Sequence, residues 1–498
     1  MKHIKQNIIY HYTLILFLSV IQLGCSKDYL QLEPPAAQTP ENIFSTTKNA
    51  WAAVNGMHRM LYSQWYSNQA AGGQSGNMLY TEVLGDDIVM TAQANGWFVS
   101  EYRWLSHRND ASSIVRFNYG FYYTFIGNAN MIIANIDKAT GSDQDKNFIK
   151  GQALAYRAWS YFQMIQLFAP AYIRGGDNSA LGLSIVLEPS TTAIPRSTVE
   201  EVYTQINKDI DEAIALLTPI TTRPSKSQIN VNVAKGIKAR VALAQQNWDV
   251  AAQMAVAARQ GTSLMTNTQY LEGFSDTGNP EWIWGVDHRD DQPTYFYSYY
   301  AYLGNFSSTN TRGNPKAIFS KLYAKITPTD VRKQLWDSTG KNASFPLVAG
   351  GTRRPYMTRK FLLANPNNSN GDLVLMRTAE MYLIEAEALA KIGGKEAEAK
   401  QALFTLANRR DPNYTLSTNT GAALIEEILT QRRIELWAEG FRFYDLKRLN
   451  LPLDRTGGNH DNTLAQKFTE PAGTKEWVFL IPRAEIEYTQ GIVVQNPL

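Results

Sequence analysis

The stretch from Met376 to Arg448 decides the fold, because it contains three consecutive segments with helical periodicity. They read MRTAEMYLIEAEALAKIGG, KEAEAKQALFTLANRRDPN and, after a short gap, IEEILTQRRIELWAEGFRFYDLKR. In the first two, apolar residues recur three or four positions apart, which is typical of helices with one buried face. Gly393 and Gly394 end the first helix. Alanines in both segments allow close approach, so the two helices are predicted to form an antiparallel hairpin of the tetratricopeptide type.

The third segment places charged and apolar residues on the same turns. Arg432 and Glu435 lie three positions apart, as do Arg442 and Asp445, and opposite charges meet on a helix surface at this spacing. The pattern is compatible with an ion-pair network that ties the segment to its neighbours, and equally with a solvated charged face. Spacing alone does not separate the two interpretations.

A second hairpin pattern runs from Val231 to Arg259, with VAKGIKARVALAQQ followed by NWDVAAQMAVAAR. The two hairpins are far apart in the sequence, so the repeats are dispersed, and a single globule is expected instead of an open solenoid. Residues 261–370 are rich in glycine, proline and asparagine and are predicted to form a large loop-rich insertion. The expected fold class is mainly α, with tetratricopeptide-like helical hairpins, that insertion, and final helices at 376–448.

The first 40 residues resemble an export leader and a tether. A short apolar run follows MKHIK and ends at QLGC, which is typical of a secretory signal and too short for a membrane span. Cys25 is the only cysteine, and its place after Leu23 and Gly24 resembles the lipidated first residue of a bacterial lipoprotein. The prediction is a signal peptide at 1–24, then a tether at 25–40 anchored by palmitate-type acyl chains on Cys25. The alternative is an ordinary cleaved signal with an incidental cysteine.

Composition and charge argue against several classes of function. The chain is 44% hydrophobic and 19% charged, with a formal net charge of +3, which gives no electrostatic reason to expect nucleic acid as a partner. The six histidines include no pair at metal-ligand spacing. Asp86 with Asp87, or Asp287 with Asp290, has the chemistry of a glycosidase acid and base or of calcium ligands. Adjacent loop carboxylates are more often turn residues, so no catalytic residue, metal or cofactor is predicted.

Aromatic residues crowd two loop regions. Tyrosine or phenylalanine fills six of the eight positions from Tyr295 to Tyr302, which is more hydroxyl-bearing rings than a core requires. Trp97 follows a polar loop that contains Asp87 and Asn95. Sugar rings stack on aromatic planes while their hydroxyls bond to amides and carboxylates, so this combination suits a glycan. The alternative for the tyrosine run is a strand that turns alternate rings toward a core.

Two motifs carry a family resemblance. RRIELWAEGFRFYDLKRLN and the C-terminal VFLIPRAEIEYTQGIVVQNPL resemble the terminal signature of the SusD/RagB family, the surface glycan-binding lipoproteins of Bacteroidetes. The resemblance implies an N-terminal SusD-like helical region at 41–260 and a C-terminal SusD/RagB region at 261–498. It favours six residues of the two aromatic regions as ligand-binding residues, namely Asp87, Asn95, Trp97, Tyr295, Tyr297 and Tyr299.

The same resemblance implies a function. Proteins of the SusD/RagB family are not enzymes; they capture an oligosaccharide or polysaccharide and deliver it to a SusC-like TonB-dependent transporter. The chain is therefore expected at the outer membrane of the cell, surface-exposed and held by its lipid anchor. A different class of function, a tetratricopeptide-like scaffold that binds protein or peptide partners, is the alternative. The identity of the glycan does not follow from the sequence.

Overall fold

The computed structural model of the chain describes residues 39–304 and 306–498. It divides into two units, Met1–Ile43 and Phe44–Leu498, and the described part of the first unit contains the short helix α2 (Pro40–Ile43). The predicted signal peptide, Cys25 and most of the predicted tether lie outside the described residues. All the elements named below belong to the second unit.

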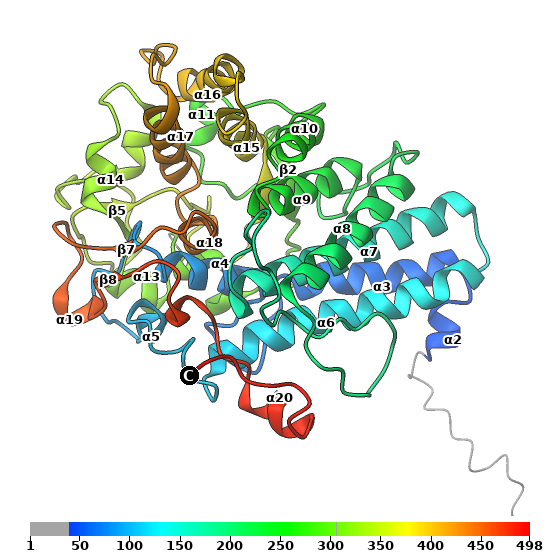
Figure 1. The fold of residues 1–498 in the computed structure, drawn as a ribbon. Coiled ribbons are helices and arrows are strands. Elements are labelled where there is room, and N and C mark those ends of the chain that lie inside the picture. The colour runs from blue at the N-terminus through cyan, green and yellow to red at the C-terminus, as the bar shows by residue number, and fades with distance from the viewer. Residues whose placement is uncertain (1–38, 305) are drawn as a thin grey trace, which may run out of the picture. The chain divides into compact units, whose positions relative to one another are not determined.

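Long helices lie side by side in the N-terminal part of this unit (Figure 1). They are α3 (Thr47–Met60), α6 (Ser113–Asn135), α7 (Asp143–Phe168) and α8 (Val199–Leu217). Helix α7 packs against both α6 and α8, and almost its whole length is buried. Its N-cap is Ser142, whose side chain accepts the N–H of Asp145, and it ends before Pro170, which cannot continue a helix.

Both predicted hairpins are present. They are α9 (Val231–Ala244) with α10 (Trp248–Ala258), and α15 (Thr378–Ala390) with α16 (Glu396–Arg410). Helix α10 packs on α15, so the two repeats are neighbours in space although they are distant in sequence. Helix α17 (Gly421–Glu435) packs on α15 and α16. The core between these last three helices consists of small and leucine-type residues: Ala379, Leu383, Ala386, Ala399, Ala402, Leu403, Leu406, Leu424, Ile428 and Leu436.

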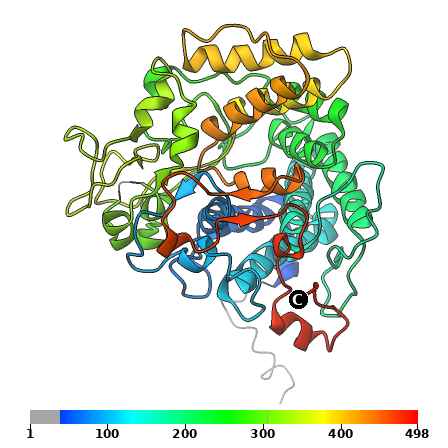
Figure 2. The ribbon, with the colours of Figure 1, turned by 60° about the vertical axis from the view of Figure 1, so that its left-hand side comes forward.

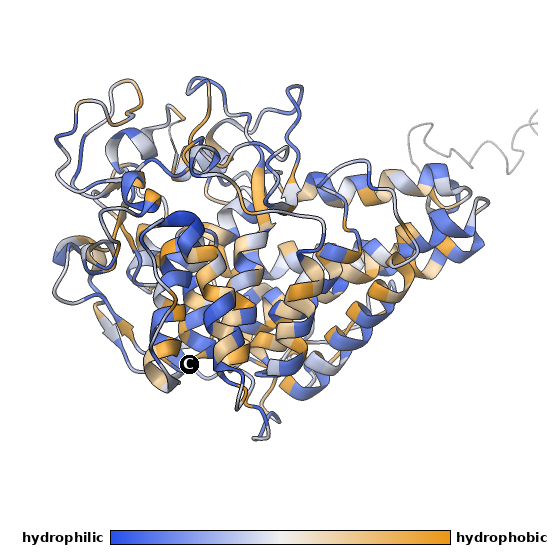
Figure 3. Ribbon diagram, turned by 90° about the horizontal axis from the view of Figure 1, so that it is seen from above, coloured by the Kyte–Doolittle hydropathy of each residue, from blue (hydrophilic) through white to orange (hydrophobic). Residues whose placement is uncertain are grey.

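The predicted mainly α fold is confirmed. Figure 2 shows helices α15–α17, in yellow to orange, at one end of the second unit and the red C-terminal helix α20 (Arg483–Tyr488) at the other. Figure 3 shows hydrophobic and hydrophilic residues alternating along the helices, as expected for helices with one buried face. Shorter helical elements complete the unit: α4 (Gly73–Val83), α5 (Val99–Tyr102), η3 (Ile136–Lys138), α11 (Asn267–Tyr270), η4 (Tyr295–Tyr297), α12 (Tyr299–Tyr302), α13 (Thr309–Gly313), α14 (Ser320–Ala324), η5 (Val331–Leu335), α18 (Arg442–Arg448), α19 (Asn462–Ala465) and η6 (Lys475–Trp477).

The strands are short and antiparallel. The first sheet has the order β1 (Ile88–Val89), β3 (Ala317–Ile318), β5 (Met357–Thr358), β4 (Trp336–Asp337), the second pairs β2 (Trp282–Val286) with β6 (Leu373–Arg377), and the third pairs β7 (Leu453–Asp454) with β8 (Thr469–Glu470). The tyrosine run is not a strand, because its residues form η4 and then α12. The strand alternative for this run is therefore wrong.

Candidate functional site

The first sheet brings the two predicted aromatic loops together. Strands β1 and β3 pair in antiparallel register, with Ile88 opposite Ile318. Beyond the strands, the side-chain oxygen Oδ1 of the buried Asn314 accepts the N–H groups of Thr91 at 2.9 Å and Ala92 at 3.3 Å. The loop that carries Trp97 is thereby fastened to the segment that follows the tyrosine run.

Four side chains of these loops that are at least partly exposed are together called the aromatic surface: Trp97, Tyr295, Phe296 and Tyr297. Tyr295 is 60% exposed and Phe296 is 43% exposed, while Trp97 and Tyr297 are half-buried. The Trp97 ring packs edge to face on the buried ring of Tyr302, with ring centroids 5.9 Å apart. Rings that are supported from below and open above offer flat apolar faces to a ligand.

A third loop, which precedes α4, supports the same surface. The Tyr302 hydroxyl donates to the carbonyl oxygen of Gln69 at 2.5 Å and accepts the N–H of Gly72 at 3.1 Å. A Cβ atom at Gly72 would lie 2.0 Å from the carbonyl oxygen of Tyr297. Only glycine fits at this contact, so the loop before α4 and the tyrosine run touch through their backbones.

Left-handed backbone conformations gather in these loops. Tyr66, Ser67, Ala94, Phe98 and Tyr295 have φ angles of 51°, 53°, 45°, 64° and 42°. Residues with a side chain rarely adopt such angles, and each instance costs on the order of 1–3 kcal/mol. Strain of this kind persists only where the surrounding contacts hold the backbone, so the loops around the aromatic surface are shaped by their packing.

Two of the predicted ligand-binding residues do not face a ligand. Asp87 is 2% exposed, and its carboxylate lies 2.6 Å from Nη2 of Arg433 and 3.3 Å from Nε of Arg442. Tyr299 is also 2% exposed, and its hydroxyl donates to the carbonyl oxygen of Ala438. The structure therefore corrects the prediction for both residues, because a buried carboxylate between two guanidinium groups and a core ring are not open to a sugar.

Asn95 lies at the edge of the aromatic surface. Its side chain is exposed, and its Oδ1 accepts the N–H of Trp97 at 3.3 Å, which fixes the turn that presents the indole. Phe296 was not among the predicted residues, although it belongs to the same aromatic run. Its exposure depends on the change from η4 to α12 at Ser298, and no periodicity in the sequence marks that change.

A buried ion network lies behind the loops. Glu435 is fully buried, and its carboxylate contacts Arg377 at 2.6 Å, Arg410 at 3.0 Å and Arg332 at 3.1 Å. Burial alone would raise the pKa of Glu435, but the three guanidinium groups, Arg410 first, hold it well below its usual value. Glu281 shares two of these arginines, at 2.7 Å from Arg377 and 2.8 Å from Arg410. The network joins α17 to α16, β6 and η5.

The solvated-face alternative for the third predicted helix is therefore wrong, and so are the predicted partners. Arg432 contacts Asp445 at 2.7 Å instead of Glu435, and Arg442 contacts Asp86 at 2.5 Å. Burial would raise the pKa of Asp86, but Arg442 and Arg433 lower it to about 2. Each expected pair lies within one helix, α17 or α18, but both helices are packed in the interior, so their charged side chains pair mainly with groups of neighbouring elements.

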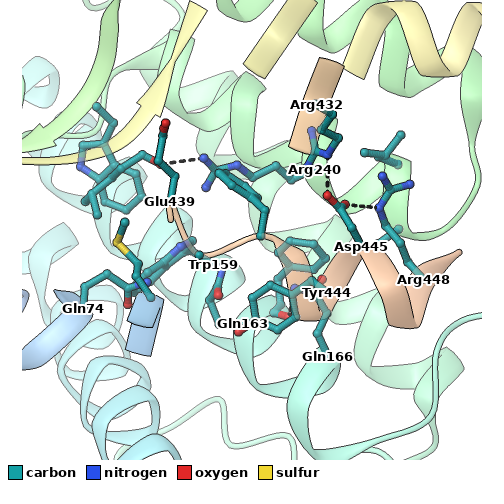
Figure 4. Close-up of a pocket in the computed structure, with 18 residues that line it drawn as sticks. Gln74, Trp159, Gln163, Gln166, Arg240, Arg432, Glu439, Tyr444, Asp445 and Arg448 are labelled. Atoms are coloured by element: carbon teal, nitrogen blue, oxygen red, sulfur yellow. Dashed lines mark hydrogen bonds and ion pairs between the residues drawn. The ribbon is translucent and has the colours of Figure 1, made fainter. Parts of the chain in front are cut away.

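A cavity of about 50 Å³, lined by both polar and apolar side chains, lies where α4, α7, α9 and α18 meet (Figure 4). Arg432 and Arg448 both point at Asp445 on one side of it, with Nε atoms 2.7 and 2.8 Å from the carboxylate. Trp159 and Tyr444 also line it. This volume has room for a few water molecules and is far below the roughly 300–1,000 Å³ of pockets that hold small ligands. The cavity is part of the packed interior and is not the glycan site.

Three of the four described histidines have the properties of core residues. Burial lowers the pKa of His58, His107 and His460 to about 3, so these rings are neutral at pH 7. His58 is paired with the Tyr156 hydroxyl, 2.6 Å away. Within residues 39–304 and 306–498, no group of three His, Cys, Asp or Glu side chains is placed to hold a metal ion.

Family models match nearly the whole chain. The model described as the SusD family matches residues 262–498, and the model described as "Starch-binding associating with outer membrane" matches residues 28–243. The chain belongs to the SusD family. It is a family of SusD-like carbohydrate-binding proteins and is not known as an enzyme family. SusD-like protein P2 of Formosa agariphila is 24% identical over 98% of this chain and 99% of its own length.

Solved SusD structures share the fold. A SusD-like carbohydrate binding protein from Bacteroides vulgatus is 25% identical, with a TM-score of 0.78 over 90% of this chain and 97% of that one. A laminarin binding SusD-like protein is 20% identical, with a TM-score of 0.67 over 91% of this chain and 100% of that one. Among the described residues of this SusD protein, no helix combines the length and the apolar character needed to cross a membrane.

Proposed function

We propose that the chain captures a glycan on the aromatic surface formed by Trp97, Tyr295, Phe296 and Tyr297. The observation that carries the proposal is that two loops about 200 residues apart, each with aromatic rings open to solvent, are joined through β1 and β3 on a chain of a carbohydrate-binding family. Asn95 supplies a polar group at the edge of that surface. Capture requires no bond cleavage, so no reducing ends should appear when the protein is incubated with a polysaccharide it retains.

The proposal includes delivery and anchoring. The protein would sit on the outer membrane through acyl chains on Cys25, after removal of residues 1–24, with residues 25–40 as the tether. It would pass its glycan to a SusC-like TonB-dependent transporter. The family description that names association with the outer membrane supports the location. Acyl chains contribute about 0.8 kcal/mol per buried methylene, so a multiply acylated cysteine holds a protein firmly.

Removing two exposed rings tests the site. Trp97→Ala with Tyr295→Ala should weaken retention of laminarin or soluble starch in affinity electrophoresis, because each stacked ring contributes roughly 1–3 kcal/mol of apolar burial. Together the losses correspond to a factor of at least about 30 in affinity. Phe404→Ala removes a half-buried ring on α16 and serves as the control. Unchanged retention in the double variant, or retention of peptides in place of glycans, would contradict the proposal and favour the scaffold function.

Replacing Cys25 tests the anchor. Cys25→Ser should yield a folded protein that leaves the membrane fraction in a detergent-free wash, because the acyl chains depend on that thiol alone. Melting of the released protein should match that of the detergent-extracted parent. A variant that stays in the membrane fraction would show that lipidation at Cys25 is not the anchor.

A further inference from the structure

A large cleft lies along helix α6, apart from the residues of the aromatic surface. Its volume is about 800 Å³, and it is lined by α6, by residues 184–194 of the α7–α8 connection and by α20. Figure 1 shows this connection looping out beside α6 with α20 next to it. Pockets that hold small ligands typically measure about 300–1,000 Å³, so the cleft has room for several sugar rings.

The walls of the cleft are held in place by side chains of α6 and α7. The Tyr123 hydroxyl donates to the carbonyl oxygen of Ser184 at 2.9 Å, and Asn130 Nδ2 donates to the carbonyl oxygen of Val186, also at 2.9 Å. The Tyr161 hydroxyl accepts the N–H of Val186 at 2.7 Å. The base of the α7–α8 connection is thus fixed on the helices, so the cleft exists before any ligand arrives.

The lining of the cleft has the chemistry of a site for uncharged sugars. Tyr119 and Tyr123 pack with ring centroids 4.7 Å apart, and the 88%-exposed ring of Tyr488 also lines the cleft. The described lining includes hydroxyl and amide side chains and the carboxylates Glu188 and Glu485, but neither lysine nor arginine. Carboxylates without a neighbouring cation repel an anionic ligand and accept hydrogen bonds from hydroxyls.

One loop borders both sites. The 46%-exposed Tyr66 belongs to the loop whose Gly72 touches Tyr297. At its other side, a Cβ atom on Gly120, which lines the cleft, would lie 2.2 Å from the Tyr66 hydroxyl oxygen. A glycan held on the aromatic surface therefore has a second polar and aromatic cleft close by.

We propose that this cleft is a second carbohydrate site, which takes an uncharged glycan chain and is separate from the aromatic surface. The inference rests on the proposed function in one respect only, that the ligand is a glycan. Anionic glycans rich in uronate or sulfate are excluded by the two carboxylates of the lining.

A bulky residue on the floor of the cleft provides a clean test. Gly127 lines the cleft within α6, and no heavy atom lies within 4 Å of a Cβ built on it, so Gly127→Trp fills the cleft without displacing a native contact. Gly56 lies within α3 and is equally open, which makes Gly56→Trp a matched control. Both variants should melt at or above the parent temperature, because glycine disfavours a helix interior.

Binding is measured by calorimetric titration of the full chain with maltohexaose, laminarihexaose and hexagalacturonate. The parent and Gly56→Trp should bind a neutral hexasaccharide at two sites, and Gly127→Trp should lose one of them, with at least a tenfold fall in its affinity. Trp97→Ala with Tyr295→Ala should lose the other site and keep the cleft. Hexagalacturonate should not bind in the cleft.

The outcomes separate the two proposals. If the isotherm of Gly127→Trp superimposes on that of Gly56→Trp, the cleft is not a site, while the loss of binding in the ring variant would still support the proposed function. If only Gly127→Trp loses binding, the cleft stands and the aromatic surface does not. Binding of hexagalacturonate that Gly127→Trp removes would overturn the uncharged ligand class, and binding of no neutral hexasaccharide would overturn both proposals.

Discussion

At the scale of single residues, Glu82 fastens the turn after α17 to helix α4. It is 1% exposed, and its Oε1 accepts the N–H groups of Gly440 and Phe441, each at 2.8 Å. Burial raises the pKa of Glu82 to about 7, although these N–H groups act in the opposite direction. Near neutral pH this carboxyl group is therefore partly protonated.

Replacing Glu82 by glutamine should make the protein more stable at alkaline pH. The folded pKa of about 7 lies above the ordinary value of 4.5, so the contribution of Glu82 to stability is complete below pH 4.5 and is lost as the pH rises through 7. Glu82→Gln keeps an acceptor oxygen and removes the titration. Urea unfolding at pH 5 and pH 8 should show near-equal stability at pH 5 and an advantage of up to about 3 kcal/mol for the variant at pH 8. A variant that is less stable at pH 8 would show that the ionised carboxylate is favoured.

The exposed aromatic residues of the candidate site were easier to predict from the sequence than the burial of Asp87 and Tyr299. Trp97 and Tyr295 follow polar loops, and large rings in such places often stay at the surface. Asp87 lies in the same polar loop and is equally suited to bind a sugar hydroxyl by its sequence context. However, Arg433, which neutralises it, lies 346 residues away, and no local sequence pattern predicts that contact. Tyr299 differs from Tyr295 only by its position on α12, which depends on the turn at Ser298.

At the scale of elements, helix α17 offers a comparison within a single helix. Glu435 is fully buried among three guanidinium groups, whereas the exposed Glu426 pairs with Lys325 at 3.0 Å and accepts the Thr430 hydroxyl at 3.3 Å. Glu435→Gln should lower the free energy of unfolding by about 3–5 kcal/mol, because it leaves buried cations without their partner. Glu426→Gln should change it by about 1 kcal/mol or less. Equal denaturant midpoints for the two variants would show that the network contributes no more than a surface pair.

The long helices were predictable, and the strands and short helices were not. Alanine spacing identified the hairpins α9–α10 and α15–α16, because small residues repeated at helical spacing are typical of closely packed helices. Strands β1 and β3 are two residues long, too short to show alternation. Yet these two strands join the loops of the aromatic surface. The geometry of the site therefore depends on elements that the sequence pattern does not predict.

At the scale of the whole second unit, the two regions named from the family resemblance are interlocked. Buried carboxylates of Asp86 and Asp87 belong to the first region, and their partners Arg442 and Arg433 belong to the second. The C-terminal segment returns to the first region, where Asn496 Nδ2 donates to the carbonyl oxygen of Phe168 at 2.8 Å. Separating the regions would leave buried charges without their partners and would expose the end of α7 to solvent.

Residues 44–260 alone should therefore fail to fold. We expect a fragment of these residues to be insoluble or to lack a cooperative thermal transition in circular dichroism, because unpaired buried charges are strongly destabilising. Co-expression with residues 261–498 should restore a soluble complex. A cooperative melt of the isolated fragment would show that the N-terminal helices are an independent domain.

The left-handed backbone of Tyr66, Ser67, Ala94, Phe98 and Tyr295 has a consequence for how recognition is divided between folding and binding. Folding supplies the free energy that holds these loops in an unfavourable shape, so little conformational entropy is left for a ligand to remove. Selection for a more stable fold would favour substitutions that remove the strained backbone angles of these loops. Selection for higher glycan affinity would oppose such substitutions. The same few strained backbone angles thus lower the stability of the fold and raise the affinity for the glycan.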